Sequence, residues 1–230
     1  MHMWNGKRKA LTFSYDDGIE QDIRLAGLFD HYGLKCTFNL NSGINENGET
    51  WDYKGIKVRR AGLSGLVKPF ARHEVAAHSV SHPNLADLPH EQMLYEIRQD
   101  IADLESTFGV RIHGMAYPFG GYNDTVIQTL ANCGLRYART ADSSHAFNLP
   151  AHTFRLQPTC HHNDYRMGEL ADLFLNTKPG DGFPMLFYIW GHSYEFDADD
   201  NWRMLEMLCE KLAGRDDVFY GTNAEVLGLK

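Results

Sequence analysis

Two adjacent carboxylates, Asp16 and Asp17, stand directly before a glycine at the end of an apolar run near the N-terminus. Paired carboxylates can divide their work, since one can bind a cation while the other stays free as a general base. Gly18 permits a sharp turn that brings both side chains toward one point. An ordinary Asp-Gly turn at a strand end has the same sequence, so the pair needs support from elsewhere in the chain.

Three histidines add to this chemistry. His78 and His82 are four residues apart, and on one helical turn this spacing lets two imidazoles bind the same metal ion. With 12 histidines in 230 residues, about 0.6 such pairs arise by chance, so the spacing counts only in context. His192 follows an apolar run and could act as a general acid, because histidine titrates near neutral pH. A histidine held by local hydrogen bonds is the alternative.

A further group of possible ligands is Cys160 with its neighbours His161 and His162. Adjacent side chains do not easily bind one ion, so we expect a surface or packing role for this group. None of the four cysteines forms a C-x-x-C metal knuckle or redox pair, and reduced, mostly buried thiols are the expectation.

The elements that must position these residues alternate along the chain. Strand-like runs cover 10–15, 36–40, 74–77, 112–117 and 185–190, with weaker ones at 136–139 and 153–156. Helical periodicity covers 20–32, 90–108, 124–133, 167–175 and 202–212, while 41–72 is expected to form a long loop or small hairpin excursion. This alternation predicts a parallel sheet covered by helices, as an open sheet or a barrel. In a parallel barrel all strands end on one face, so the polar clusters that follow the strands are expected to converge there.

The composition limits the classes of function. The length favours one domain spanning 1–230, and the hydrophobic fraction of 43% excludes a wholly disordered chain. The net charge of −8 argues against nucleic acid or an anionic membrane as partner. No run approaches the roughly 18 apolar residues of a membrane span. The N-terminus as given lacks the apolar core of a signal peptide, which indicates a cytoplasmic protein.

Four segments resemble, in order, the motifs of the polysaccharide deacetylases, the NodB-homology carbohydrate esterases. They read TFSYDDG at 12–18, HEVAAHSVSHP at 73–83, YPFGGYN at 117–123 and YIWGHS at 188–193. The first two motifs are the more specific ones. Together the motifs extend the resemblance from residue 9 to about residue 193.

This resemblance implies an α/β fold, a distorted (β/α) barrel with seven or eight strands. It implies a divalent metal ion, usually zinc, held by Asp17, His78 and His82, and the same ligands also suit cobalt or nickel. Asp16 would be the general base and His192 the general acid. A metal ion held by one carboxylate and two imidazoles keeps an open position for water, as in catalytic zinc sites, which agrees with the reading of the residues themselves.

The resemblance also implies an oxyanion contact from the backbone N–H of Phe119, and it has two gaps. The third motif of the family usually begins with an arginine that orients the catalytic aspartate, and Ala116 stands there. Arg139, at the end of the next predicted strand, is our candidate to replace it. Asp142 is the candidate for orienting His192.

The sequence therefore favours a metal-dependent hydrolase that removes N- or O-linked acetyl groups from a carbohydrate. One alternative is hydrolysis of a non-sugar amide or cyclic imide at the same metal site. Another is a non-catalytic carbohydrate-binding protein, for which the alanine at 116 is the one supporting feature. The sugar, the metal and the oligomeric state are left open by the sequence.

Overall fold

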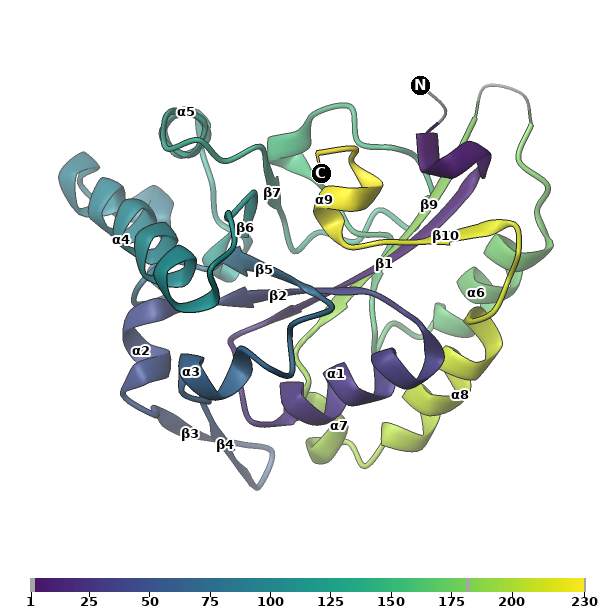
Figure 1. Cartoon of the computed structure of the whole chain (residues 1–230), viewed down its shortest axis with the longest axis horizontal. Coiled ribbons are helices and arrows are strands. Elements are labelled where there is room, and N and C mark those ends of the chain that lie inside the picture. The colour runs from purple at the N-terminus through teal and green to yellow at the C-terminus, as the bar shows by residue number, and fades with distance from the viewer. Residues whose placement is uncertain (1–2, 181–182, 230) are drawn as a thin grey trace.

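A curled sheet of parallel strands forms the centre of the computed structural model, which describes residues 3–180 and 183–229. Seven strands follow one another in the order β7-β6-β5-β2-β1-β9-β8 and curl into a half-barrel, and β10 pairs with the first residues of β1 (Figure 1). The strands of this sheet are β1 (Lys9–Asp16), β2 (Cys36–Leu40), β5 (Glu74–Ala77), β6 (Gly114–Ala116), β7 (Tyr137–Arg139), β8 (Cys160–His161), β9 (Met185–Gly191) and β10 (Val218–Tyr220). The mixed α/β fold expected from the sequence is thus confirmed.

The central strands are buried because both faces of the sheet are covered. Every residue of β1, β2 and β5 is buried, as is typical of parallel strands beneath helices. Strand β1 pairs with β9 over seven residues and with β2 over four, so it is the axis of the sheet. Since all pairs are parallel, the strands end at the same edge.

Helices surround the outside of the curled sheet (Figure 1). They are α1 (Gln21–Tyr32), α4 (His90–Phe108), α5 (Asp124–Asn132), α6 (Met167–Asn176), α7 (Tyr194–Ala198) and α8 (Trp202–Leu212). The short helix α9 (Asn223–Val226) lies on the other face of β1, where Asn223 accepts a hydrogen bond from Thr12 and Ala224 packs with Ala10. Gly33 ends α1 with φ 67°, as its position after the apolar stripe predicts. Leu25 and Phe29 of that helix are fully buried in the main core.

The segment 41–72 forms the expected excursion, and a small antiparallel hairpin stands at its centre. The hairpin consists of β3 (Thr50–Tyr53) and β4 (Ile56–Arg59), flanked by the short helices α2 (Ser42–Glu46) and α3 (Leu63–Leu66). Val58 of the hairpin is fully buried against Ile19 and Tyr194. The excursion is therefore packed against the end of β1 that carries the two aspartates.

The predicted strand at 153–156 is wrong. Thr153–Arg155 forms a 3₁₀ turn, η4, in which the His152 ring nitrogen accepts a hydrogen bond from the Phe154 N–H. One bridge from Leu156 to Arg139 remains of the expected pairing, and β8 follows at Cys160–His161. The segment between them crosses the open side of the half-barrel, from the edge of β7 to that of β9.

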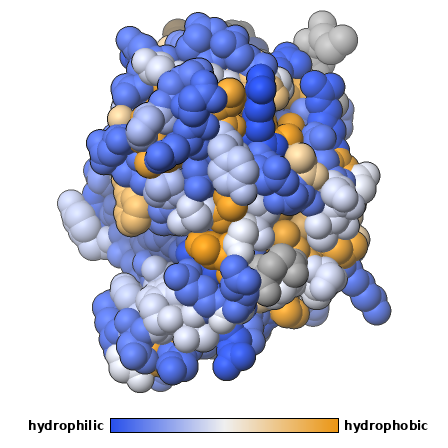
Figure 2. Space-filling model, turned by 90° about the vertical axis from the view of Figure 1, so that its left-hand side faces the viewer, coloured by the Kyte–Doolittle hydropathy of each residue, from blue (hydrophilic) through white to orange (hydrophobic). Residues whose placement is uncertain are grey.

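Figure 2 shows that the face beside α2 and α4 is mainly hydrophilic, with apolar residues in small scattered groups. Within the described residues, no helix has both the length and the hydrophobicity to cross a bilayer. The cysteines are free thiols, and three of the four are buried.

Candidate active site

A hollow of about 370 Å³ opens at the carboxyl ends of the sheet strands. Seven of the residues singled out in the sequence line it, and they come from five different strand ends. They are Asp16, Asp17, His78, His82, Phe119, Arg139 and His192. The expected convergence of the polar clusters is therefore confirmed.

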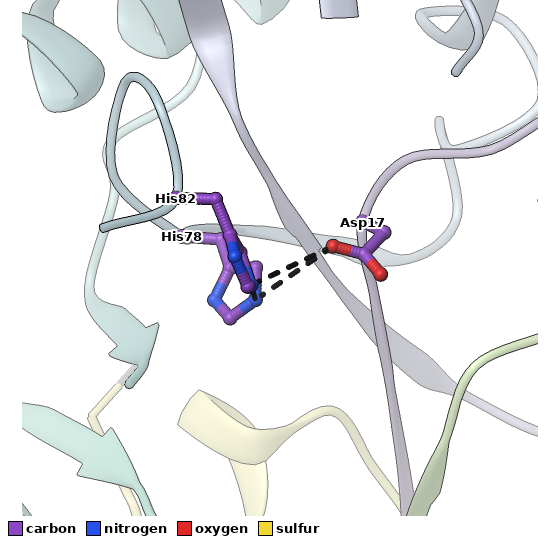
Figure 3. A group of neighbouring side chains, drawn as sticks. All are labelled: Asp17, His78 and His82. Atoms are coloured by element: carbon purple, nitrogen blue, oxygen red, sulfur yellow. Dashed lines mark hydrogen bonds and ion pairs between the residues drawn. The ribbon is translucent and has the colours of Figure 1, made fainter. Parts of the chain in front are cut away.

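The three candidate metal ligands face one another across this hollow (Figure 3). His78 and His82 place their Nε2 atoms 3.1 Å apart. Oδ1 of Asp17 lies 4.0 Å from the first of these nitrogens and 3.8 Å from the second. Two imidazole nitrogens and one carboxylate oxygen thus surround a single point, as a divalent transition metal requires.

The hydrogen bonding of His78 prepares it for a metal ion. Its Nδ1 lies 2.8 Å from the backbone oxygen of Ala116. A carbonyl oxygen only accepts hydrogen bonds, so Nδ1 carries the hydrogen and the lone pair of Nε2 faces the cluster. Burial lowers the pKa of His78 to about 4 and also lowers the pKa of His82. Both rings are therefore in the neutral form that binds metals.

The backbone around these residues is strained. Asp17, His82 and Phe119 have φ values of 84°, 57° and 57°, in the left-handed region that non-glycine residues rarely adopt. Such strain persists where surrounding structure holds it, and it gathers at functional sites. Three residues of one hollow share this conformation, so the fold stores strain where the chemistry was expected.

Arg60 is a site neighbour that the sequence analysis missed. Arg60 directly follows β4. Its Nη2 lies 3.2 Å from Oδ1 of Asp17, and its Nη1 donates to the backbone oxygen of Asp17 at 2.6 Å. Burial alone would raise the pKa of Asp17, but His192 and Arg60 lower it below its usual value. Asp17 is therefore a carboxylate at neutral pH and can act as an oxygen ligand.

Asp16 is held by two donors. Arg139 donates from Nη2 to Oδ2, and the amide of Asn39 donates to Oδ1 at 2.8 Å. Burial alone would raise the pKa of Asp16, but Arg139 and His78 lower it. The contact expected between Arg139 and Asp16 is thus present, and it supplies what Ala116 cannot. The guanidinium is also fixed by stacking, with its centre 4.4 Å from the ring centroid of Trp190.

His192 has a different partner from the one expected. Its Nδ1 lies 3.3 Å from Oε1 of Glu195, one helical turn later, and no contact joins it to Asp142 among the described residues. The expectation for Asp142 was therefore wrong. Burial alone would lower the pKa of His192, but Glu195 and the two aspartates raise it to about 9. The ring carries a proton at neutral pH, as a general acid must.

Phe119 lies at the mouth of the hollow. This residue is 74% exposed, and its ring packs edge-on against His82 with 4.6 Å between the ring centroids. A phenylalanine this exposed is free to contact a bound molecule. The site thus combines an ionised carboxylate, a protonated imidazole and a set of metal-binding groups around one space.

The model of the polysaccharide deacetylase family matches residues 5–138. An uncharacterised protein of Streptomyces coelicolor is 29% identical over 149 residues, which are 63% of this chain and 55% of that protein. The matched part of the chain therefore spans little more than half of this relative's length.

Solved structures share the fold. A family 4 carbohydrate esterase from Streptomyces lividans, in complex with acetate, aligns over 94% of this chain and 93% of its own, with a TM-score of 0.61 and 16% identity. The wild-type family 4 pseudoenzyme BA3943 from Bacillus anthracis aligns over 97% of this chain and 66% of its own, with a TM-score of 0.57 and 15% identity. Since the family model matches more than half of its residues, this chain belongs to the polysaccharide deacetylase family.

Proposed function

We propose that the protein is a metal-dependent hydrolase that removes acetyl groups, N- or O-linked, from a carbohydrate. The observation that carries this proposal is the meeting of three separate functions in one hollow. Asp17, His78 and His82 offer a metal site, Asp16 stands beside it with its own donors, and His192 carries a proton. Binding a sugar alone would require none of these.

The donor set fits a divalent transition metal, with zinc the best match and cobalt or nickel also suited. Arg60 bears on this fit, because its guanidinium contacts Oδ1 of Asp17 and neutralises part of the charge of this carboxylate. When bound, the ion would supply Lewis acidity toward a water molecule and the acetyl carbonyl.

The residues of the chain then divide the proton transfers. Asp16 accepts a proton from the attacking water, and Arg139 with Asn39 keeps this carboxylate ionised and aimed. The backbone N–H of Phe119 stabilises the negative charge that develops on the acetyl oxygen. His192 donates its proton to the departing amine or alcohol, which leaves as a neutral group.

Membership of the deacetylase family supports acetyl removal over the alternative of a non-sugar amide or cyclic imide. The non-catalytic alternative rested on the alanine at 116. That support weakens because Arg139 makes the contact which Ala116 cannot make.

The test is acetate release across a panel of N-acetylated and O-acetylated oligosaccharides, with and without added zinc. We expect release from at least one carbohydrate and a dependence on the metal. A matched variant, Asp16→Asn, controls for contaminating esterases because it removes the proposed base. Acetate release from none of the sugars, by protein that holds its metal, would contradict the proposal.

A further inference from the structure

A second group of metal-binding side chains lies behind His192, outside the hollow. It consists of His161 at the end of β8, the next residue His162, and Glu195 of α7. Oε2 of Glu195 lies 3.2 Å from Nε2 of His161 and 3.0 Å from Nε2 of His162. We propose that these three side chains bind a divalent transition metal ion, separate from the one at Asp17.

The distances between the ligand atoms of this cluster are close to those of a tetrahedral metal site. Ligand bonds of about 2.0–2.1 Å in a tetrahedral site place the ligand atoms about 3.3 Å from one another. The two distances to Glu195 are close to this value. They are shorter than the distances of 3.8 and 4.0 Å between Asp17 and its two histidines.

The buried ring of His162 independently supports an ion at this cluster. Its side chain is only 1% exposed, and neither of its ring nitrogens has a hydrogen-bond partner among the described residues. Although Nε2 is close to Glu195, the direction of the contact does not suit an N–H donor. Buried polar groups are normally satisfied, and an ion bound to Nε2 would account for one of these two nitrogens.

The local backbone explains how two adjacent residues can act together, which the sequence analysis did not expect. Strand β8 ends at His161, so the alternation of side chains stops there. The two rings lie on the same side, with centroids 4.4 Å apart and planes inclined by 37°. The ring of His162 stacks between those of Phe196 and Tyr15, with distances between ring centroids of 4.2 Å and 5.6 Å.

The surroundings suit a bound ion. His161 keeps 24% of its side chain exposed, and His162 also lines a separate hollow of about 430 Å³, so an ion has a path to the cluster. The backbone N–H of Asn163 donates to Nδ1 of His161 at 3.2 Å. A neutral ring that binds an ion through Nε2 carries its hydrogen on Nδ1, so metal binding requires the loss of this hydrogen bond. Glu195 would bind the ion through Oε2 while Oε1 stays toward His192, so the ion would steady the carboxylate that holds that histidine.

Zinc stoichiometry and Co²⁺ absorption titrations of the full chain test the proposal. We expect about two ions per chain in the wild type. His161→Ala and Glu195→Gln should weaken the second ion at least about tenfold, the lower bound seen even when only a supporting contact of a metal site is lost. His145→Ala is the matched control, because His145 pairs with a carboxylate, Asp164 at 2.6 Å, but lies outside the cluster. That variant should keep both ions.

The double variant His78→Ala/His82→Ala separates this proposal from the proposed function. It should lose the ion of the active site and keep about one ion, which His161→Ala then removes. Wild-type stoichiometry in both His161→Ala and Glu195→Gln would overturn the second site. Loss of all bound metal in the double variant would also overturn it, while leaving the proposed function intact.

Discussion

Replacing Arg139 by alanine should damage catalysis more than substrate binding. The guanidinium and the carboxylate of Asp16 are 2% and 4% exposed, so the variant leaves a buried negative charge without its partner. Breaking such a pair costs about 3–5 kcal/mol of stability. The carboxylate keeps its hydrogen bond from Asn39 but loses the donor at its other oxygen. A shift of about 1 Å in a catalytic group can cost about 10²-fold in rate, so we expect kcat to fall by about that factor.

Three measurements separate positioning from a merely structural role. First, kcat for acetate release should fall in Arg139→Ala, while KM and the metal content stay close to those of the wild type. Second, Arg139→Lys should recover part of the rate, because it restores the charge but not the two-pronged geometry. Third, Asp16→Asn/Arg139→Ala should be no slower than Asp16→Asn, because residues that act as one unit are not additive.

The control for this prediction is Arg155→Ala. Arg155 forms an ion pair of the same type with Asp124 at 2.8 Å, but these side chains are 50% and 92% exposed. Exposed pairs contribute about 0–1 kcal/mol, so this variant should be close to wild type in stability and rate. A wild-type kcat in Arg139→Ala, with lower stability alone, would refute the positioning role.

Three further predictions concern the ligands, a turn and a buried acid. His82→Ala should lose most of the metal bound at the active site. His152→Ala, at an exposed position outside the hollow, is the control and should keep this metal. Equal metal content in the two variants would contradict the ligand assignment. Gly18→Ala should destabilise the fold in urea titrations by about 1–2 kcal/mol or more, because Gly18 has φ 62° and an added Cβ would lie 2.5 Å from Nδ2 of Asn45. The control is Gly27→Ala, which should not destabilise the fold because the space around Gly27 is open. Burial raises the pKa of Asp22 to about 7, so the folded state holds this proton more tightly than the unfolded state, and the group lowers stability as the pH rises from about 4 to 7. The slope of unfolding free energy against pH should therefore be less negative in Asp22→Asn than in the wild type. Equal slopes would show that folding does not raise the pKa of Asp22.

The sequence was informative where a residue's neighbours along the chain decide its place. Periodicity located β1 and α1, and the end of each strand then placed Asp16, His78 and His192 at one edge. The ligand roles and the oxyanion role of Phe119 came from the family resemblance, because two histidines four apart are weak evidence by themselves.

Other parts of the site depend on contacts between distant segments. Arg60 reaches Asp17 from 43 positions away, because the hairpin packs against the end of β1. An arginine in a polar excursion carries no local signal of that contact. Glu195 is different, since its spacing of three from His192 is typical of side chains that meet on a helix and could have been noticed. Strand β8 has only two residues, too few to show any periodicity.

The central claim is that two different aspartates serve as metal ligand and as general base, and one comparison tests it most directly. Zinc-loaded wild type and zinc-loaded Asp16→Asn should be compared for metal content and for acetate release from the same acetylated oligosaccharide. We expect equal metal content and a loss of about 10²–10⁴-fold in turnover, the usual contribution of a general base. Loss of the metal in Asp16→Asn, or turnover at the wild-type rate with the metal retained, would contradict the roles assigned to Asp16 and Asp17.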